Sequence, residues 1–222
     1  MKDYYKLPAD HPNVGRMRPE LTYAWGGAGL LTRTAIGVCG SRRASDLGLE
    51  YAYELGKLAA EFELVVVSGY AGGVDQRAHL GALEAGGATI AVLAEGMEHF
   101  ALRVSLRDHV TASNFLAVST YDPDAIWTNW RAMQRNKTII SLVDAMFVVE
   151  AADKGGTLAA GLDALNLRRP LYVLDFKDDR PTTRGNTLLI QKGARVISNR
   201  RQLKDALSRA SSGELQTKYV LL

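Results

Sequence analysis

From Ala35 onward, short apolar runs alternate with longer amphipathic stretches, and this alternation constrains the fold more than any other feature of the sequence. The apolar runs show no polar alternation, which is typical of strands buried on both faces of a parallel sheet. They are Ala35–Cys39, Leu64–Val67, Thr89–Leu93, Phe115–Val118, Ala145–Val149 and Leu171–Leu174. The pattern predicts an α/β domain built on a doubly wound, mostly parallel sheet.

The stretches between the runs have helical periodicity. Between Leu47 and Phe62, the spacing of Leu47, Tyr51, Leu55, Leu58 and Phe62 predicts one apolar helix face that packs on the sheet. Further predicted helices are Val74–Ala85, Arg103–Ala112, Trp130–Val143, Thr157–Leu167 and Arg200–Leu207, with a short late strand at Arg195–Ile197.

Composition changes at both ends of this pattern. Residues 1–34 hold three of the six prolines and have no helical or strand period, so they are predicted to form an N-terminal arm and an extension of the core. Residues 35–210 are predicted to be a single domain. Residues 211–222 form a tail that ends in the apolar segment Tyr219–Leu222, which has room to dock on the body or on a partner.

Composition and charge exclude several classes of protein. Hydrophobic residues at 47% and charged residues at 23% exclude a disordered chain. The single cysteine, Cys39, excludes an internal disulfide, and the four histidines do not have the spacing of metal ligands. With a net charge of only +3, any nucleic-acid site must be a local pocket and not a positively charged surface that covers the whole protein.

No targeting or membrane segment is evident in the sequence. The apolar stretches are far shorter than the roughly 20 residues of a spanning helix, and the N-terminus lacks the apolar core of a signal peptide. We therefore expect a cytoplasmic protein without a membrane partner.

Small and cationic residues gather where three predicted strands end. Parallel sheets bind ligands at the carboxyl ends of their strands, and glycine lets a backbone approach an anion closely. The loops are Gly40–Arg43, Ser68–Gly73 and Glu150–Thr157. Together they predict one anion pocket, with Ser41, Arg42, Lys154 and Thr157 as donors, although glycine also serves as plain punctuation in short turns.

The loops do not match the standard nucleotide signatures. Neither G-x-x-x-x-G-K-[ST] nor G-x-G-x-x-G is present, which weakens nucleotide hydrolysis and ordinary dinucleotide binding. Asp75 comes early in a helix, where it is expected to stabilise the helix dipole. Glu150, Asp75 and His79 remain as acid–base candidates without a defining spacing.

In combination these motifs resemble the DNA processing protein A family, also called DprA or Smf. The resemblance runs from about Pro19 to Ile197. It rests on Gly40-Ser41-Arg42, on Val65–Gly96, Gln134–Leu165 and Arg184–Ala194, and on Leu21–Gly26, which is similar to the short strand before the family's core. It implies a Rossmann-like domain that binds single-stranded DNA, protects incoming strands and helps to load a RecA-type recombinase during natural transformation.

The resemblance also assigns site residues by position. It implies DNA or phosphate contacts from Gly40, Ser41 and Arg42 (the G-S-R loop), Ser68 and Gly69 (the start of S-G-L-A-R-G-I-D), Arg135, Asn136 and Lys137 (R-N-R), and Lys154, Gly155, Gly156 and Thr157 (K-S-G-[ST]). His79 matches the histidine of the family's A-H pair. No catalytic residue, metal or cofactor is implied, and the expected partners are single-stranded DNA, a RecA-type recombinase and a second copy of the chain.

The sequence departs from the family pattern at several positions. Gly72 replaces an arginine, Lys137 replaces the last arginine of R-N-R, Gly155 replaces a serine, and Leu174-Asp175 replaces a P-G pair. Lys137 keeps the charge but loses bidentate geometry. With little sequence on either side of the core, these departures predict a divergent, core-only member.

Other functions stay open at this stage. A nucleotide or nucleotide-derived molecule would suit the same pocket, as in the similar phosphoribohydrolase families, but Ala159 and Ala160 lie where their catalytic glutamate would be. That difference argues against hydrolysis and for a protein that is not an enzyme. An interaction module would rely on the apolar tail. Tyr70, Trp127 and Trp130 are expected either to stack on bases or to pack against their neighbours.

Overall fold

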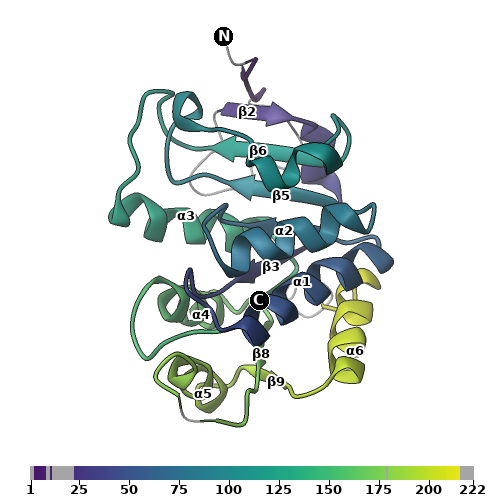
Figure 1. Cartoon of the computed structure of the whole chain (residues 1–222), viewed down its shortest axis with the longest axis vertical. Coiled ribbons are helices and arrows are strands. Elements are labelled where there is room, and N and C mark those ends of the chain that lie inside the picture. Colours follow the sequence, from purple (N-terminus) through teal and green to yellow (C-terminus); the bar gives the residue numbers. More distant parts are fainter. Residues whose placement is uncertain (1–2, 9–10, 12–22, 179, 216–222) are drawn as a thin grey trace.

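The chain forms one mixed sheet in a computed structural model that describes residues 3–8, 11, 23–178 and 180–215. Leu21, Thr22 and the tail segment Tyr219–Leu222 lie outside the described residues. Among the described residues the sheet has nine strands in the order β1-β2-β6-β5-β4-β3-β7-β8-β9 (Figure 1). The strands are β1 Tyr5–Lys6, β2 Tyr23–Gly26, β3 Ala35–Cys39, β4 Val65–Ser68, β5 Ala88–Val92, β6 Phe115–Ser119, β7 Ala145–Val148, β8 Leu171–Leu174 and β9 Arg195–Ile197.

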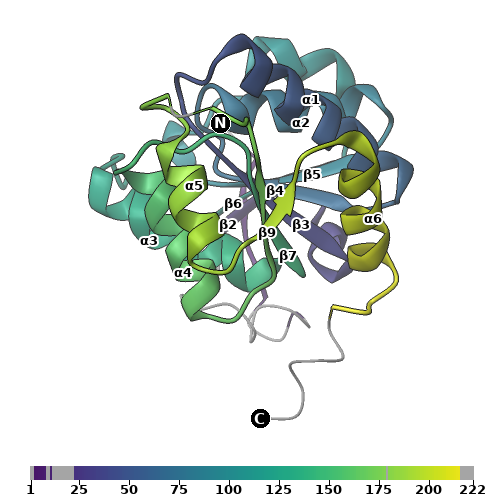
Figure 2. The same cartoon turned by 90° about the horizontal axis from the view of Figure 1, so that it is seen from below.

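Helices cover both faces of this sheet, as the alternating pattern predicts. Figure 2 shows α1, α2 and α6 on one face and α3, α4 and α5 on the other. The helices are α1 Asp46–Glu61, α2 Val74–Glu84, α3 Asn129–Leu142, α4 Gly156–Asn166, α5 Arg184–Gln191 and α6 Arg200–Ser211, with 3-10 turns η2 Ala28–Thr32, η3 Met97–His99 and η4 Val104–His109. The predicted fold class, a Rossmann-like α/β domain, is confirmed.

Strand order reverses at β3, and this reversal positions the functional site. From β3 the chain adds β4, β5 and β6 in one direction, and then crosses through α3 to add β7, β8 and β9 in the other. The pairs from β6 to β9 are all parallel, while β2 pairs antiparallel with β6, through Tyr23 opposite Ser119. The loops that follow β3, β4 and β7 therefore leave the sheet at the same edge.

The buried face of α1 differs from the predicted one. Leu55 and Leu58 are buried, but Leu47 and Tyr51 are exposed. The face that packs inward instead carries small residues, because α1 lies very close to α2. A Cβ added at Gly56 would collide with the carbonyl oxygen of Ala78, and one added at Gly81 would collide with that of Tyr53.

Two further predictions need correction. The expected helix Arg103–Ala112 is a shorter 3-10 segment, η4, whose only buried residue is Leu106, so it lacks the apolar face that would hold an α-helix. The sequence pattern does not predict helix α5, because its eight residues are fewer than the roughly 10–12 over which a helical period is recognised. Across the described ranges, no helix is both long and apolar enough to span a membrane.

Candidate functional site

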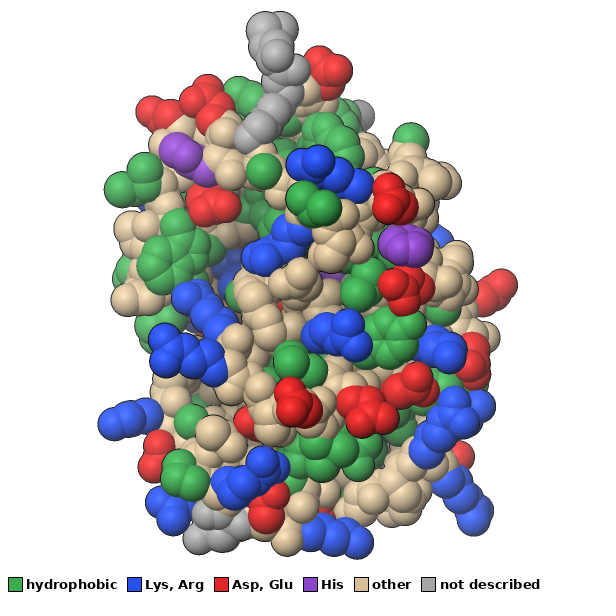
Figure 3. Space-filling model, in the orientation of Figure 1, with side chains coloured by type: hydrophobic (Ala, Val, Ile, Leu, Met, Phe, Trp, Pro, Cys, Tyr) green, Lys and Arg blue, Asp and Glu red, His purple; other side chains and the backbone are tan. Residues whose placement is uncertain are grey.

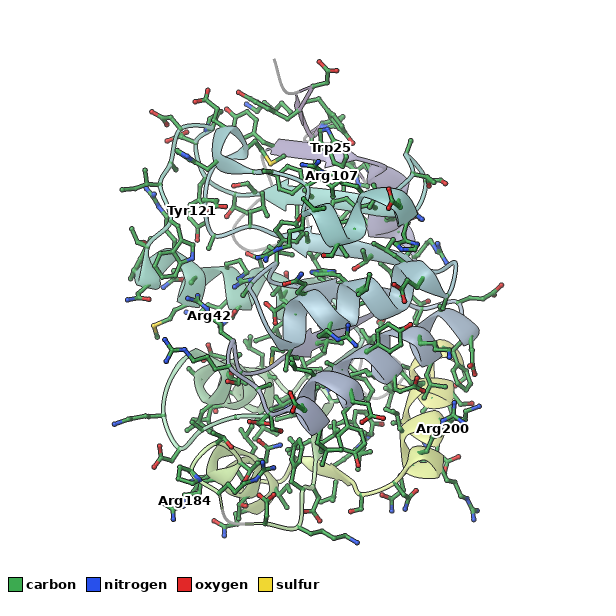
Figure 4. All side chains as sticks on the ribbon, in the orientation of Figure 1. Trp25, Arg42, Arg107, Tyr121, Arg184 and Arg200 are labelled. Carbon is green, nitrogen blue, oxygen red and sulfur yellow. The ribbon has the colours of Figure 1, made fainter. Side chains whose placement is uncertain are left out.

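A cavity of about 680 Å³ opens at the carboxyl ends of β3 and β7, beside the point where strand order reverses. Arg42, labelled in Figure 4, lies at the edge toward which the arrows of β5 and β6 point in Figure 1. The predicted site residues that line the cavity are Gly40, Ser41, Arg42, Arg135, Asn136, Lys154, Gly155, Gly156 and Thr157. The structure thus brings the first and third predicted loops together with the start of α3.

Hydrogen bonds between main-chain groups lock these loops to one another. The Ser41 N–H donates to the carbonyl of Glu150 at 2.8 Å, and the Ser41 carbonyl accepts from the Val74 N–H at 3.2 Å. Gly73, at a φ of +73°, passes so close to the Ser41 carbonyl oxygen that a Cβ there would collide with it. The G-S-R loop is therefore held between β7 and the first turn of α2.

Glu150 fixes the start of α1 and is not placed as an acid–base group. Its buried carboxylate accepts from the Ser45 N–H at 3.1 Å and from the Ser45 hydroxyl at 2.6 Å. The Ser45 hydroxyl oxygen in turn accepts from the Gly48 N–H at 3.2 Å, as an N-cap does. Both carboxylate oxygens of Glu150 accept hydrogen bonds from Ser45, so this side chain has a structural role at the start of α1.

Asp75 and Arg135 both line the cavity while being buried, each only 6% exposed, and they interact electrostatically. Asp75 accepts from the Ala71 N–H at 3.2 Å, and Arg135 Nη1 donates to the Val92 carbonyl at 3.1 Å. Burial raises the pKa of the Asp75 carboxyl, and the charge of Arg135 opposes that rise. Asp75 lies in the first turn of α2, as expected, and also holds the Ser68–Gly73 loop in place.

The remaining predicted residues lie outside this cavity. Ser68 is fully buried and its hydroxyl donates to the Val38 carbonyl at 2.6 Å. Gly69 makes room for Arg135, because a Cβ at position 69 would overlap the guanidinium. Lys137 is exposed and does not belong to the cavity lining.

Two exposed tryptophans lie near the start of α3, Trp127 just before it and Trp130 in its first turn, and Trp127 contacts Arg42. The Arg42 guanidinium carbon lies 5.0 Å from the centre of the Trp127 ring, in cation–π geometry. Trp127 is 41% exposed and Trp130 is 65% exposed, so neither ring packs into the core. Figure 3 shows basic and apolar side chains side by side on this flank, over α3 and α4.

Tyr70 does not present its ring to a ligand. Its ring packs among His79, Phe100 and Phe115, and its hydroxyl accepts from the Arg103 N–H at 2.8 Å. The expectation that Tyr70 stacks on a base is wrong, and the alternative of packing against its neighbours is confirmed.

A second, smaller cavity of about 250 Å³ adjoins the first and shares Arg42, Ala71 and Arg135 with it. Its lining includes Arg103, which the sequence did not suggest, because η4 has neither a glycine-rich loop nor a strand end to mark it. The other lining residues are Gly69, Tyr70, Gly72, Leu93, Ala94, Glu95 and Trp127.

Burial keeps two titratable groups near the cavities, Cys39 and His79, in their neutral forms. Burial raises the pKa of the Cys39 thiol to about 12, so no thiolate forms at neutral pH. Burial also lowers the pKa of His79 to about 3, which keeps its imidazole uncharged. Within the described part of the chain, no three His, Cys, Asp or Glu residues are grouped as metal ligands.

Known proteins match this chain in sequence. The family model described as DNA recombination-mediator protein A matches residues 4–208. The DNA processing protein DprA of Bacillus subtilis is 31% identical over 182 residues, which are 81% of this chain and 61% of that protein. The chain therefore spans about three fifths of the length of this relative, and 64% of the length of the Streptococcus pneumoniae protein.

Two solved structures of the same kind superpose on most of the chain. The DNA processing protein A of Helicobacter pylori, a structure described for its single-stranded DNA binding mode, has a TM-score of 0.79 and 25% identity over 93% of this chain and 98% of that one. The Streptococcus pneumoniae protein has a TM-score of 0.77 and 26% identity over 90% of this chain and 72% of that one.

Proposed function

The chain belongs to the DNA recombination-mediator protein A family, and on that premise we propose that its cavity binds single-stranded DNA without base preference. One observation carries the proposal: at the point where strand order reverses, Arg42 lines an open cavity together with the Lys154–Thr157 loop and also lies on the ring of Trp127, which lines the adjoining cavity. The Helicobacter pylori relative, whose described subject is single-stranded DNA binding, has the same fold.

In this proposal phosphates contact the first and third loops. Arg42 and Lys154 neutralise phosphate charge, and the hydroxyls of Ser41 and Thr157 donate hydrogen bonds. Gly155 and Gly156 let the strand approach the backbone, whereas the missing side chain at Gly40 makes room for Val74. Gly155 is the N-cap of α4, so the free N–H groups and positive dipole end of that helix face the same anion. Asn136 fixes this loop, since its amide donates to the Gly156 carbonyl at 3.4 Å.

The other predicted residues are proposed to act at longer range. Arg135 adds positive charge from the floor of both cavities, and Ser68 and Gly69 keep the loop around it in shape. Lys137, exposed beyond the rim, would meet a phosphate outside the cavity.

Bases would stack on the exposed aromatic flank. Trp127 and Trp130 present ring faces that any base can use, which gives affinity without sequence readout. Arg42 already lies on the Trp127 ring, so a base and the guanidinium can share that platform. This combination favours a nucleic-acid strand over a small phosphorylated molecule.

The biological setting is proposed from the family. We propose that residues 35–210 form the binding domain, with residues 1–34 as arm and core extension and residues 211–222 as a tail. A recombination mediator transfers strands to a recombinase, so a RecA-type protein is the proposed partner, and a second copy of the chain is a further one. DNA recombination inside the cell implies a cytoplasmic location and a binding role without catalysis.

The test is a titration of fluorescently labelled oligothymidine against the purified chain at low salt. We expect saturable binding that a mixed-sequence single strand competes for equally well and that a nucleoside triphosphate competes for poorly. If the triphosphate displaces the oligonucleotide at equal phosphate concentration, the nucleotide-ligand alternative is favoured. If no single strand binds at low salt, the proposal is wrong.

A further inference from the structure

The second cavity contains a cation that its neighbours hold in one position. Arg103 Nη2 donates to the Tyr70 carbonyl at 2.7 Å, and Nη1 donates to Gln76 Oε1 at 3.3 Å. The guanidinium carbon also lies 5.0 Å from the centre of the Tyr70 ring. The Nε–H of the same group is buried and, among the described residues, has no hydrogen-bond partner. Arg103 also lines the cavity, and a guanidinium held in one position at a cavity wall is suited to an anionic ligand.

The cavity is positively charged and has open space beside Gly72. Arg42, Arg103 and Arg135 line it together with one carboxylate residue, Glu95. No heavy atom lies within 4 Å of the place where a Cβ at Gly72 would be, and the φ of this glycine is outside the left-handed range. A side chain at position 72 would therefore extend freely without backbone strain.

The two cavities are continuous through shared residues. Arg42, Ala71 and Arg135 line both, and Trp127, which carries Arg42 on its ring, lines the second. A strand that contacts Arg42 and Lys154 in the first cavity therefore has an adjoining positively charged surface over the Gly69–Gly72 loop. A mononucleotide would occupy only one of the two.

Building on the proposed function, we propose that the second cavity binds a further phosphate of the same DNA strand and that Arg103 is its principal ligand. Arg103, the N-cap residue of η4, thus supplies a cation to a loop whose own position 72 has no side chain. The interface spans both cavities, so affinity depends on a strand long enough to reach from Lys154 to Arg103.

The first test compares Arg103→Ala with Arg107→Ala by fluorescence anisotropy on labelled oligothymidine. Arg107 is the matched control, because it lies in η4, four residues after Arg103, is exposed, and donates a hydrogen bond to the Leu102 carbonyl outside both cavities. We expect Arg103→Ala to weaken binding about tenfold, as the loss of a charge-assisted hydrogen bond does. The log–log salt slope should become shallower by about 0.7, the value for one single-strand phosphate. Arg107→Ala should change neither.

A second set of variants separates charge from loop support, because Arg103 also holds Tyr70. Gly72→Glu places a carboxylate in the cavity while every native contact of Arg103 stays, and Gly72→Gln is its neutral match. We expect Gly72→Glu to weaken binding and Gly72→Gln to leave it near the parent value. Adding Gly72→Arg to the Arg103→Ala variant should restore most of the lost affinity, since it returns a cation to the same cavity.

The outcomes separate this inference from the proposed function. If Arg42→Ala weakens binding while Arg103→Ala and Gly72→Glu bind like the parent, the second site is wrong and the first stands. If Arg103→Ala weakens binding but Gly72→Arg restores nothing and Gly72→Glu matches Gly72→Gln, Arg103 only supports the loop and the inference is overturned. If the parent itself binds no oligothymidine at low salt, both proposals fail.

Discussion

Arg42 lies where two features of the site meet, the G-S-R loop and the Trp127 ring. Its neighbour Arg43 is also exposed, but it does not line either cavity. The backbone N–H of Arg43 donates to the Ser41 hydroxyl oxygen at 3.0 Å, a bond that alanine at position 43 would keep. The two adjacent arginines therefore differ in position relative to the cavity and not in charge.

We predict that Arg42→Ala lowers the affinity for single-stranded DNA by about 1–3 kcal/mol, the range for a charge-assisted hydrogen bond to phosphate. Because Arg42 is exposed, the thermal midpoint should hardly change. Anisotropy titrations with Arg43→Ala as the control measure the difference, and Arg43→Ala should lose much less. Equal binding by both variants and the parent would mean that this loop is structural only.

His79 is a second residue whose environment sets a measurable property. The Thr89 hydroxyl donates to the Val66 carbonyl at 2.6 Å, so His79 Nδ1 carries the proton in the 2.5 Å bond to Thr89 Oγ1. Burial lowers its pKa from 6.5 to about 3, with the charges of Arg103 and Arg135 as smaller causes. The unfolded chain therefore binds a proton that the folded chain does not.

We predict that this difference destabilises the fold in mild acid. Between the unfolded pKa of 6.5 and the folded value of about 3, the free energy of unfolding should fall with decreasing pH by up to about 1.4 kcal/mol per pH unit. Urea denaturation at several pH values between 5 and 7 measures this slope. Replacement of His79 by Gln should flatten it, and an unchanged slope would show that His79 is not the titrating group.

At the scale of elements, the pair α1 and α2 depends on glycine. Replacing glycine by alanine inside a helix usually stabilises the helix by about 1 kcal/mol. At Gly81, however, the added Cβ would meet the rigid backbone carbonyl of Tyr53. Steric overlap of this kind typically costs about 1–3 kcal/mol, which exceeds the gain in propensity.

We therefore predict that Gly81→Ala lowers the free energy of unfolding by up to about 2 kcal/mol, the difference between these opposing effects. Gly29→Ala is the control, because nothing lies within 4 Å of the corresponding Cβ. Chemical denaturation of both variants measures the change. A stabilised Gly81→Ala protein would mean that α1 and α2 can move apart at little cost.

Some elements could be predicted from the sequence and others could not, and the difference lies in how each element packs. Strands such as β3 and β8 were predicted at their observed limits, because continuous apolar runs correspond to strands buried on both faces. The face of α1 was predicted incorrectly, since Leu47 and Tyr51 fit the helical period but contact with α2 requires small residues. Size complementarity between distant segments leaves no periodic signal.

Helix α5 shows a second limit of sequence patterns. Its burial depends on Asn186, whose amide donates to the carbonyls of Val149 and Leu174, each at 2.7 Å, and accepts from the Ala151 N–H at 2.7 Å. This polar side chain bridges the ends of β7 and β8, while Leu189 packs into the core. With only eight residues, the helix is shorter than the roughly 10–12 residues over which an apolar period indicates a helix.

For the whole molecule, topology determined how much of the site could be predicted. Loops that follow parallel strands converge at one edge of the sheet, so the sequence alone predicts that Arg42 and the Lys154 loop lie together, as they do in the first cavity. Arg103 could not be predicted, because it reaches the second cavity from a 3-10 segment through contacts with Tyr70. The sequence thus indicates where a site forms, while long-range side-chain contacts decide its extent.

The net charge of +3 is small for a chain of this length, so the salt dependence of binding should report the local site and not the overall charge. Three cations line the connected cavities without being buried, namely Arg42, Arg103 and Lys154, while Arg135 is held at the floor. At roughly −0.7 per single-strand phosphate, three contacts predict a log–log salt slope of about −2. Oligothymidine titrations over a range of salt concentrations measure this slope. A value near zero would contradict phosphate binding, and a much steeper one would require contacts beyond the two cavities.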